Sequence, residues 1–390
     1  MKKDESNLIR IQSERSPHRE HSTPIYLSSS FTFDNAEQGR ALFAEEEVGN
    51  IYSRFSNPNS SEFINKMVQL ENGEDGFAFS SGMAAVFAGL AALLKSGEHI
   101  VASRALFGSS HQILTKLLPR WGITSTYVDT GNNAEWESAI QKNTKMIFVE
   151  TPSNPGLDLV DLEFVSSLAK RHNLVLHVDN TFATPLLQKP IDYGADLVSH
   201  SATKYIDGQG RTIGGIIVGK KDLLKEIRFF ARQTGPSLSP FNAWVLSKSL
   251  ETLSVRVEKH CSNALQLAET LENNSELVLV KYPLLPSHTQ FDLAKKQMKL
   301  GGGIITITVT GGLIRAKKFI DSIKMASLTA NLGDTRTIVT HPASTTHSKL
   351  TNEERELVGI SPGLIRISVG LENINDITDD IFQALEESKN

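Results

Sequence analysis

The sequence predicts an α/β fold, with a mainly parallel sheet in a large domain and a smaller C-terminal α+β domain. Five short apolar runs lead to this prediction, and they cover residues 99–103, 146–150, 174–179, 197–200 and 214–218. Segments long enough to form helices separate them. Continuous apolar runs of this kind are typical of strands that are buried on both faces of a parallel sheet covered by helices.

The chain divides into three predicted segments. Residues 1–60 have little periodicity and many Ser, Asn and Pro residues, so we expect an N-terminal extended arm rather than an independent domain. Residues 61–250 contain the apolar runs and form the predicted large domain. Residues 251–390 form the predicted C-terminal domain, in which strands near 303–309 and 365–369 are mixed with helices.

The composition narrows the class of protein. With 390 residues, 39% hydrophobic and 22% charged, the chain can bury a large core, and its net charge of −4 provides no basic surface for nucleic acid. The longest apolar run, residues 82–94, is too short to span a bilayer, and the N-terminus lacks a signal-peptide pattern. The single cysteine, Cys261, excludes an internal disulfide and a cysteine-rich metal site. We therefore expect a cytoplasmic protein that binds small molecules, with no nucleic acid, membrane or metal.

The segment 199–205 carries the most informative chemistry. It places Lys204 just beyond the end of a predicted buried strand, and Asp179 ends the preceding predicted strand. A lysine at a strand end is most often only solvated. The nearby acid favours another interpretation, because carboxyl ends of neighbouring parallel strands meet at one edge. Lysine can form a Schiff base with an aldehyde cofactor, and aspartate keeps a pyridine nitrogen protonated. The pair therefore predicts pyridoxal 5′-phosphate.

Two further features are candidates for binding the phosphate. Gly82 and Met83 open the apolar segment 82–94, where backbone N–H groups at a helix N-terminus can bind an anion. The alternative is that the preceding serines only cap a buried helix. The hydroxyls of Ser201 and Thr203, beside Lys204 in the sequence, favour the phosphate interpretation.

In the arm, Tyr52 and Arg54 lie two residues apart in a segment predicted to be extended, so their side chains face the same way. Arginine suits bidentate recognition of phosphate. A surface turn that ends at Asn57 and Pro58 is the alternative.

Together these residues resemble the Cys/Met-metabolism family of pyridoxal-phosphate enzymes, which carry out γ-replacement and elimination on homoserine esters and cystathionine. The matching motifs are Tyr52-Ser-Arg54, Ser81-Gly82-Met83, Glu150-Thr-Pro-Ser-Asn154-Pro, Val178-Asp179-Asn-Thr, Ser199-His-Ser201-Ala-Thr203-Lys204, Leu332-Gly-Asp334 with His341-Pro-Ala-Ser344, and Leu364-Ile-Arg366-Ile-Ser-Val-Gly370. They run in family order along nearly the whole chain.

The resemblance implies a fold-type I architecture and a homotetramer, a dimer of dimers with shared active sites. It implies that Tyr52 and Arg54 bind the phosphate of the neighbouring subunit. It also implies that Arg366 holds the substrate α-carboxylate and that Asn154 contacts the cofactor's ring oxygen. The phosphate ligands that it implies within the same subunit are Gly82, Met83, Ser201 and Thr203.

Two departures from the lyase pattern bear on the reaction. Phe107 stands where lyases of the family carry a tyrosine stacked over the ring, so the stacking face is kept but the phenol is lost. Asn331 replaces a serine that is typical of cystathionine-handling members and matches the homoserine-ester sulfhydrylases. The stretches 205–211 and 234–244 resemble the O-succinylhomoserine sulfhydrylase branch.

The sequence thus predicts γ-replacement on O-succinylhomoserine with sulfide, giving homocysteine and succinate in methionine biosynthesis. Lys204 is the predicted catalytic base, Asp179 the ring partner and Asn331 a substrate-binding residue. Three alternatives stay open: an O-acetylhomoserine sulfhydrylase, a cystathionine γ-synthase or γ-lyase, and a cofactor-binding regulator without turnover.

Overall fold

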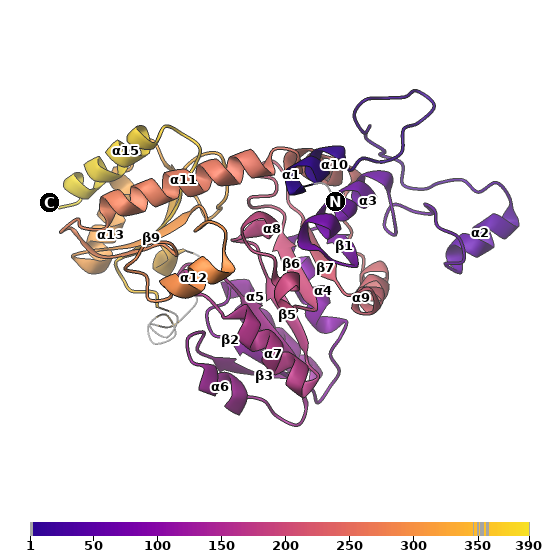
Figure 1. Cartoon of the computed structure of the whole chain (residues 1–390), viewed down its shortest axis with the longest axis horizontal. Coiled ribbons are helices and arrows are strands. Elements are labelled where there is room, and N and C mark those ends of the chain that lie inside the picture. Colours follow the sequence, from indigo (N-terminus) through magenta and orange to yellow (C-terminus); the bar gives the residue numbers. More distant parts are fainter. Residues whose placement is uncertain (1–2, 346, 349–350, 352–354, 356–358, 390) are drawn as a thin grey trace.

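The computed structural model describes residues 3–345, 347–348, 351, 355 and 359–389. Its large sheet has the strand order β1-β7-β6-β5-β4-β2-β3 (Figure 1). The strands are β1 (Asp75–Phe79), β2 (His99–Ser103), β3 (Thr124–Val128), β4 (Thr144–Glu150), β5 (Val175–Asp179), β6 (Leu197–Ser201) and β7 (Gly215–Gly219). Strand β7 runs antiparallel to β1 and β6, and the pairs from β6 to β3 are parallel. The prediction of a mainly parallel sheet is confirmed.

Strands β1 and β3 were not among the predicted apolar runs, and both have a physical reason to be missed. Strand β3 reads Thr-Ser-Thr-Tyr-Val and lies at the edge of the sheet, where most of its residues are only partly buried. Strand β1 begins with Asp75 and Gly76, two residues that are depleted in strands. The continuous apolar pattern of a doubly covered strand is therefore absent from both.

Helices pack on both sides of this sheet. They are α3 (Pro58–Glu71), α4 (Gly82–Ala91), α5 (Gly108–Gln112), η1 (Ile113–Leu117), η2 (Leu118–Trp121), α6 (Asn133–Ser138), α7 (Leu162–His172), α8 (Thr184–Leu187), η3 (Pro190–Tyr193) and α9 (Lys221–Thr234). Helix α4 packs against β6 and β7. Its N-terminus is fixed by Ser81, whose side chain accepts a hydrogen bond from the backbone N–H of Ala84 at 3.1 Å.

The C-terminal part contains a second sheet in the order β10-β11-β12-β9-β8. Its strands are β8 (Leu277–Lys281), β9 (Ile304–Val309), β10 (Ser327–Leu328), β11 (Ile338–Thr340) and β12 (Leu364–Ser368). Helix α10 (Pro240–Leu250) precedes this part and packs against α3 of the large domain. The helices that follow it are α11 (Leu253–Leu271), α12 (Phe291–Gln297), α13 (Gly312–Ser322), η4 (Pro342–Ser344) and α15 (Ile374–Glu387). Three of the four strand pairs are antiparallel.

Helix α11 joins the two hydrophobic cores (Figure 1). Leu253 and Val257 of its first half pack in a cluster with residues of the large sheet, whereas Leu267 and Leu271 pack with the C-terminal sheet. The buried Cys261 belongs to the first cluster. The domain boundary at residue 250 stays a prediction, and it falls at the end of α10.

The N-terminal segment is not wholly extended, because it contains α1 (Asp4–Arg10) and α2 (Ala36–Phe43). Asn35 caps α2 by accepting a hydrogen bond from Gln38 N at 2.9 Å. Figure 1 shows α2 and the loops on either side of it projecting away from the rest of the molecule. Nowhere in the described ranges is there a helix with the length and apolarity needed to cross a membrane.

Candidate active site

The two residues on which the cofactor prediction depends lie at the same edge of the large sheet. Asp179 is the last residue of β5, and Lys204 lies in the turn that follows β6. Strands β5 and β6 are parallel neighbours, with Asp179 opposite Ser199. The carboxyl edge of the sheet therefore holds both side chains, as strand order requires.

The Lys204 amine is held by a residue that is distant in sequence. Its Nζ donates a hydrogen bond of 2.7 Å to Oδ1 of Asn331. Burial and the positive charge of Arg366 lower the pKa of Lys204 to about 8. A sizeable fraction of the amine is thus neutral near pH 8, and the neutral amine is the form that acts as a nucleophile or a base.

Arg366, on β12, is a fully buried cation. One terminal nitrogen donates to Asn154 Oδ1 at 3.0 Å, and the other donates to the carbonyl of Asn331 at 2.9 Å. Burial lowers the pKa of Arg366 to about 10, so the guanidinium stays charged at neutral pH. No salt bridge within the described residues includes it, and its Nε has no hydrogen-bond partner among them. A buried cation without a counter-ion favours the entry of an anion such as a carboxylate.

Asp179 uses one carboxylate oxygen, Oδ1, in hydrogen bonds to the described residues, and Oδ2 accepts none from them. Its Oδ1 accepts hydrogen bonds from the backbone N–H and the hydroxyl of Thr181, at 3.0 and 2.6 Å. Burial raises the pKa of Asp179, and the hydrogen bonds from Thr181 oppose that shift. A protonated ring nitrogen beside Oδ2 would stabilise the carboxylate and be stabilised by it.

The phosphate candidates form a close contact between α4 and the end of β6. A Cβ built on Gly82 would lie 2.5 Å from the Ser201 Cβ, so only glycine lets the helix N-terminus approach this strand end. Met83 follows in the first turn of α4. The Thr203 hydroxyl lies 3.2 Å from the backbone N of Gly214. The capping serine and the anion site are thus compatible, because Ser81 bonds the N–H of Ala84 and not that of Gly82.

Phe107 is the N-cap residue that precedes α5, and its backbone N–H donates to Glu150 Oε2 at 2.7 Å. Glu150 ends β4 and is paired in register with Asp179. The sequence places Glu150 within a family motif but does not predict it as a site residue. The available signal was the same as for Asp179, an acid at the carboxyl end of an apolar strand.

Tyr52 and Arg54 contact another part of the molecule within this chain. The Arg54 guanidinium lies 4.7 Å from the centre of the Phe55 ring and donates to the carbonyl of Arg232 on α9. Tyr52 is 41% exposed. The structure therefore does not bring these two residues into the contacts of Lys204, and their role toward a neighbouring subunit stays a prediction.

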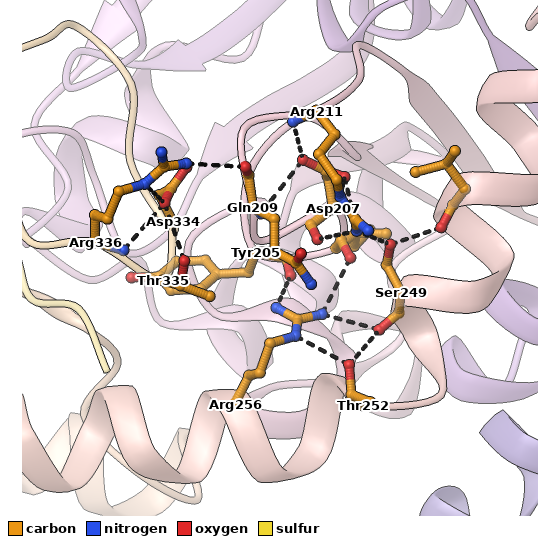
Figure 2. A network of polar contacts seen from close by, with 12 residues as sticks. Tyr205, Asp207, Gln209, Arg211, Ser249, Thr252, Arg256, Asp334, Thr335 and Arg336 are labelled. Atoms are coloured by element: carbon orange, nitrogen blue, oxygen red, sulfur yellow. Dashed lines mark hydrogen bonds and ion pairs between the residues drawn. The ribbon is translucent and has the colours of Figure 1, made fainter. Parts of the chain in front are cut away.

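A polar network fixes the segment that follows Lys204 (Figure 2). Arg256 of α11 donates to the carbonyl of Tyr205 at 2.7 Å and to that of Ile206 at 3.2 Å. The Arg336 guanidinium donates to the carbonyl of Gln209 at 3.0 Å. Arg336 lies in the same loop as Asn331, between β10 and β11. The network therefore holds the two loops that carry Lys204 and Asn331 against each other.

Comparisons with known proteins agree with this geometry. The profile of the family described as Cys/Met metabolism PLP-dependent enzyme matches residues 5–386. An O-succinylhomoserine sulfhydrylase of Pseudomonas aeruginosa is 44% identical over 377 residues, which cover 97% of this chain and 94% of that protein. An L-methionine gamma-lyase of Fusobacterium nucleatum is 45% identical over 367 residues, or 93% of each chain.

Among solved structures, one described as an O-acetylhomoserine (thiol)-lyase of Campylobacter jejuni has a TM-score of 0.95 at 34% identity and covers 99% of this chain and 100% of that one. It contains a pyridoxyl-lysine 5′-monophosphate. A cystathionine gamma synthase of Xanthomonas oryzae has a TM-score of 0.95 at 32% identity, with coverage of 100% and 99%.

The fold and the lysine–aspartate edge of its sheet define a fold-type I pyridoxal-phosphate enzyme. The chain belongs to the Cys/Met-metabolism family of these enzymes, which carry out γ-elimination and γ-replacement, and its cofactor is pyridoxal 5′-phosphate. The residues at the edge fit this group. Gly82 leaves room beside Ser201, Asp179 offers Oδ2 to a ring nitrogen, and the Lys204 amine has a lowered pKa.

Proposed function

We propose that this enzyme catalyses γ-replacement on O-succinylhomoserine with sulfide, releasing homocysteine and succinate. Two sulfhydrylases named for this substrate support the proposal, the Pseudomonas aeruginosa protein and one of Mycobacterium tuberculosis that is 42% identical over 376 residues. The methionine gamma-lyases match this chain equally well overall. The choice between the reactions therefore depends on residues at the site.

The observation that carries the proposal is the bond between the Lys204 amine and Asn331. A γ-replacement needs one base that removes a proton first from Cα and then from Cβ, and that finally returns a proton to each of these carbons. An amine with a pKa of about 8 can both accept and release protons near neutral pH. Asn331 keeps that amine in place with a neutral acceptor, which does not compete for its proton.

The other residues have complementary tasks. Bound pyridoxal phosphate supplies a ring that accepts electrons from the substrate α-carbon. Arg366 binds the substrate carboxylate and so orients the Cα–H bond toward Lys204. Succinate leaves with the electrons of the Cγ–O bond, and hydrosulfide adds to Cγ before Lys204 returns the protons to Cβ and Cα.

Phe107 separates this proposal from the lyase alternative. At that position a phenol could donate a proton to a leaving thiolate, and phenylalanine offers only a ring face. Succinate is a far weaker base than a thiolate and departs without such a donor. The site therefore suits an acylated substrate better than methionine or cystathionine.

The test is a product analysis of the purified, cofactor-loaded protein. It is given sulfide with either O-succinylhomoserine or O-acetylhomoserine, and cysteine is added as a competing acceptor. We expect homocysteine, formed faster from the succinyl ester. Faster use of the acetyl ester would support γ-replacement with sulfide but would make O-acetylhomoserine the preferred substrate.

The remaining outcomes contradict the proposal. Cystathionine as the main product would indicate a synthase, and 2-oxobutanoate from methionine without sulfide would indicate a γ-lyase. A cofactor spectrum that no acylhomoserine perturbs would indicate a regulator without turnover. The homotetramer and the cytoplasmic location stay predictions, and size-exclusion chromatography with light scattering tests the first.

A further inference from the structure

A second buried carboxyl group lies beside Asp179 and is not used by the proposed chemistry. Glu150, the last residue of β4, is the register partner of Asp179, the last residue of β5. Paired residues of neighbouring strands project from the same face of a sheet. Because both residues end their strands, the two carboxyl groups lie side by side at the carboxyl edge. Glu150 is 5% exposed and Asp179 is 9% exposed.

Glu150 connects two segments that border the predicted ring position. Its Oε2 accepts a hydrogen bond from the backbone N–H of Phe107 at 2.7 Å, and the backbone N–H of Asn154 acts on this carboxyl and lowers its pKa. Phe107 is the N-cap residue just before α5, and its ring is the predicted stacking face. Asn154 accepts a hydrogen bond from Arg366 through its side chain. One side chain thus fixes a residue predicted to lie over the ring and another predicted to lie at its edge.

We propose that Glu150 is a positioning residue, which sets Phe107 and Asn154 relative to the cofactor ring as the neutral member of a carboxyl pair with Asp179. The proposal rests on the predicted ring contacts of these residues and on the cofactor, and it does not depend on which acylhomoserine is the substrate.

Two ionised carboxylates on neighbouring strand ends in a buried site repel each other strongly, so the pair retains one proton. We assign the charge to Asp179: burial raises its pKa, but the two hydrogen bonds from Thr181, and then the charge of His200 on β6, oppose that shift. Burial, and then the charge of Asp179, raise the pKa of Glu150. The backbone N–H groups of Phe107 and Asn154 oppose that shift only in part, so the proposal assigns the proton to Glu150. A neutral acid retains the carbonyl oxygen that the N–H of Phe107 needs.

This division of roles predicts a difference between two substitutions of the same residue. Glu150→Gln keeps a neutral group of the same shape with one carbonyl acceptor, whereas Glu150→Ala leaves the N–H of Phe107 without a buried partner. The exposed Glu163 of α7, which pairs with Lys296 at the surface, provides the matched control Glu163→Gln.

The experiment uses the holoenzyme without substrate, so its result is independent of the product analysis. The visible circular dichroism of the bound cofactor reports the tilt of the ring, and equilibrium dialysis gives the cofactor dissociation constant. We expect Glu150→Gln to stay within about threefold of the wild-type dissociation constant with an unchanged dichroism band, as should Glu163→Gln. Glu150→Ala should lose most of the band and bind the cofactor about tenfold more weakly.

Two results would overturn the proposal. An unchanged band and affinity in Glu150→Ala would show that Glu150 positions nothing. A loss in Glu150→Gln as large as that in Glu150→Ala would show that the charge is required and that Glu150 is not the neutral member. If far-ultraviolet dichroism shows that Glu150→Ala is unfolded, Glu150→Asp replaces it. That side chain is one methylene too short to reach Phe107, so an unchanged band in Glu150→Asp would also contradict the proposal.

Discussion

The strand-end residues and the arm residues of the candidate site differ in what holds them in place. Asp179 and Lys204 are fixed within one chain, by Thr181 and by Asn331 respectively. Arg54, in the arm, lies against Arg232 and aromatic rings of the same chain, next to a segment that projects from the molecule. The comparison indicates that contacts within one chain hold the proposed reacting groups, and that only the predicted phosphate contacts from the arm require a second subunit.

The largest effect is expected at the strand end. Lys204→Ala removes the amine that carries the proposed proton transfers, so turnover should fall by roughly a thousandfold or more. The protein should remain folded but lose the visible absorption of the wild-type holoenzyme. Absorption spectra and homocysteine assays measure both effects, and Lys225→Ala, an exposed lysine on α9, is the control. Retained turnover in Lys204→Ala would show that the lysine at the carboxyl edge of the sheet is not needed for the reaction.

A smaller loss is expected for Arg366→Ala. Removing the buried guanidinium eliminates the proposed contact with the substrate carboxylate, so kcat/KM should fall about a hundredfold. The cofactor content should stay near that of the wild type, because the contacts proposed to hold the cofactor lie on other residues. Steady-state kinetics and the absorption of the cofactor test this. A colourless Arg366→Ala variant would mean that the residue holds cofactor and not substrate.

The arm is tested by its own variant and by mixing. Arg54→Ala should weaken cofactor binding about tenfold, through loss of one charge-assisted phosphate contact. If the arm serves the neighbouring subunit, mixed dimers of Lys204→Ala and Arg54→Ala contain one intact site each. Co-refolding equal amounts should then restore about a quarter of the wild-type sites. Activity that never exceeds the average of the two separate variants would place Arg54 in the site of its own chain.

The smallest effect concerns pH. Lys204 must be neutral to react with the cofactor aldehyde, and its pKa is lowered from 10.5 to about 8. The rate at which cofactor-free protein takes up pyridoxal phosphate should rise with pH and level off above about pH 8. Stopped-flow absorbance measures this rate. A rate that is still rising at pH 10 would indicate that Lys204 has the pKa of a solvated lysine. The strand end would then hold its residues no more firmly than the arm does.

The sequence predicted those parts of the site that follow from strand pattern alone. Asp179 and Lys204 both follow continuous apolar runs, so parallel pairing brings them to one edge whatever the loops do. The hydrogen bond from Lys204 to Asn331 joins residues 127 positions apart, and that from Phe107 to Glu150 joins residues 43 positions apart. Such contacts depend on how loops pack, which periodicity does not encode. The edge strand β3 was missed because partial burial leaves it a polar sequence.

Helix α11 gives the molecule a mechanical property that neither sheet has alone. Its first turns are part of one core and its last turns are part of the other, so neither core can lose its packing without exposing half of the buried face of this helix. Heating should therefore melt both lobes in a single cooperative transition, visible in calorimetry as one peak.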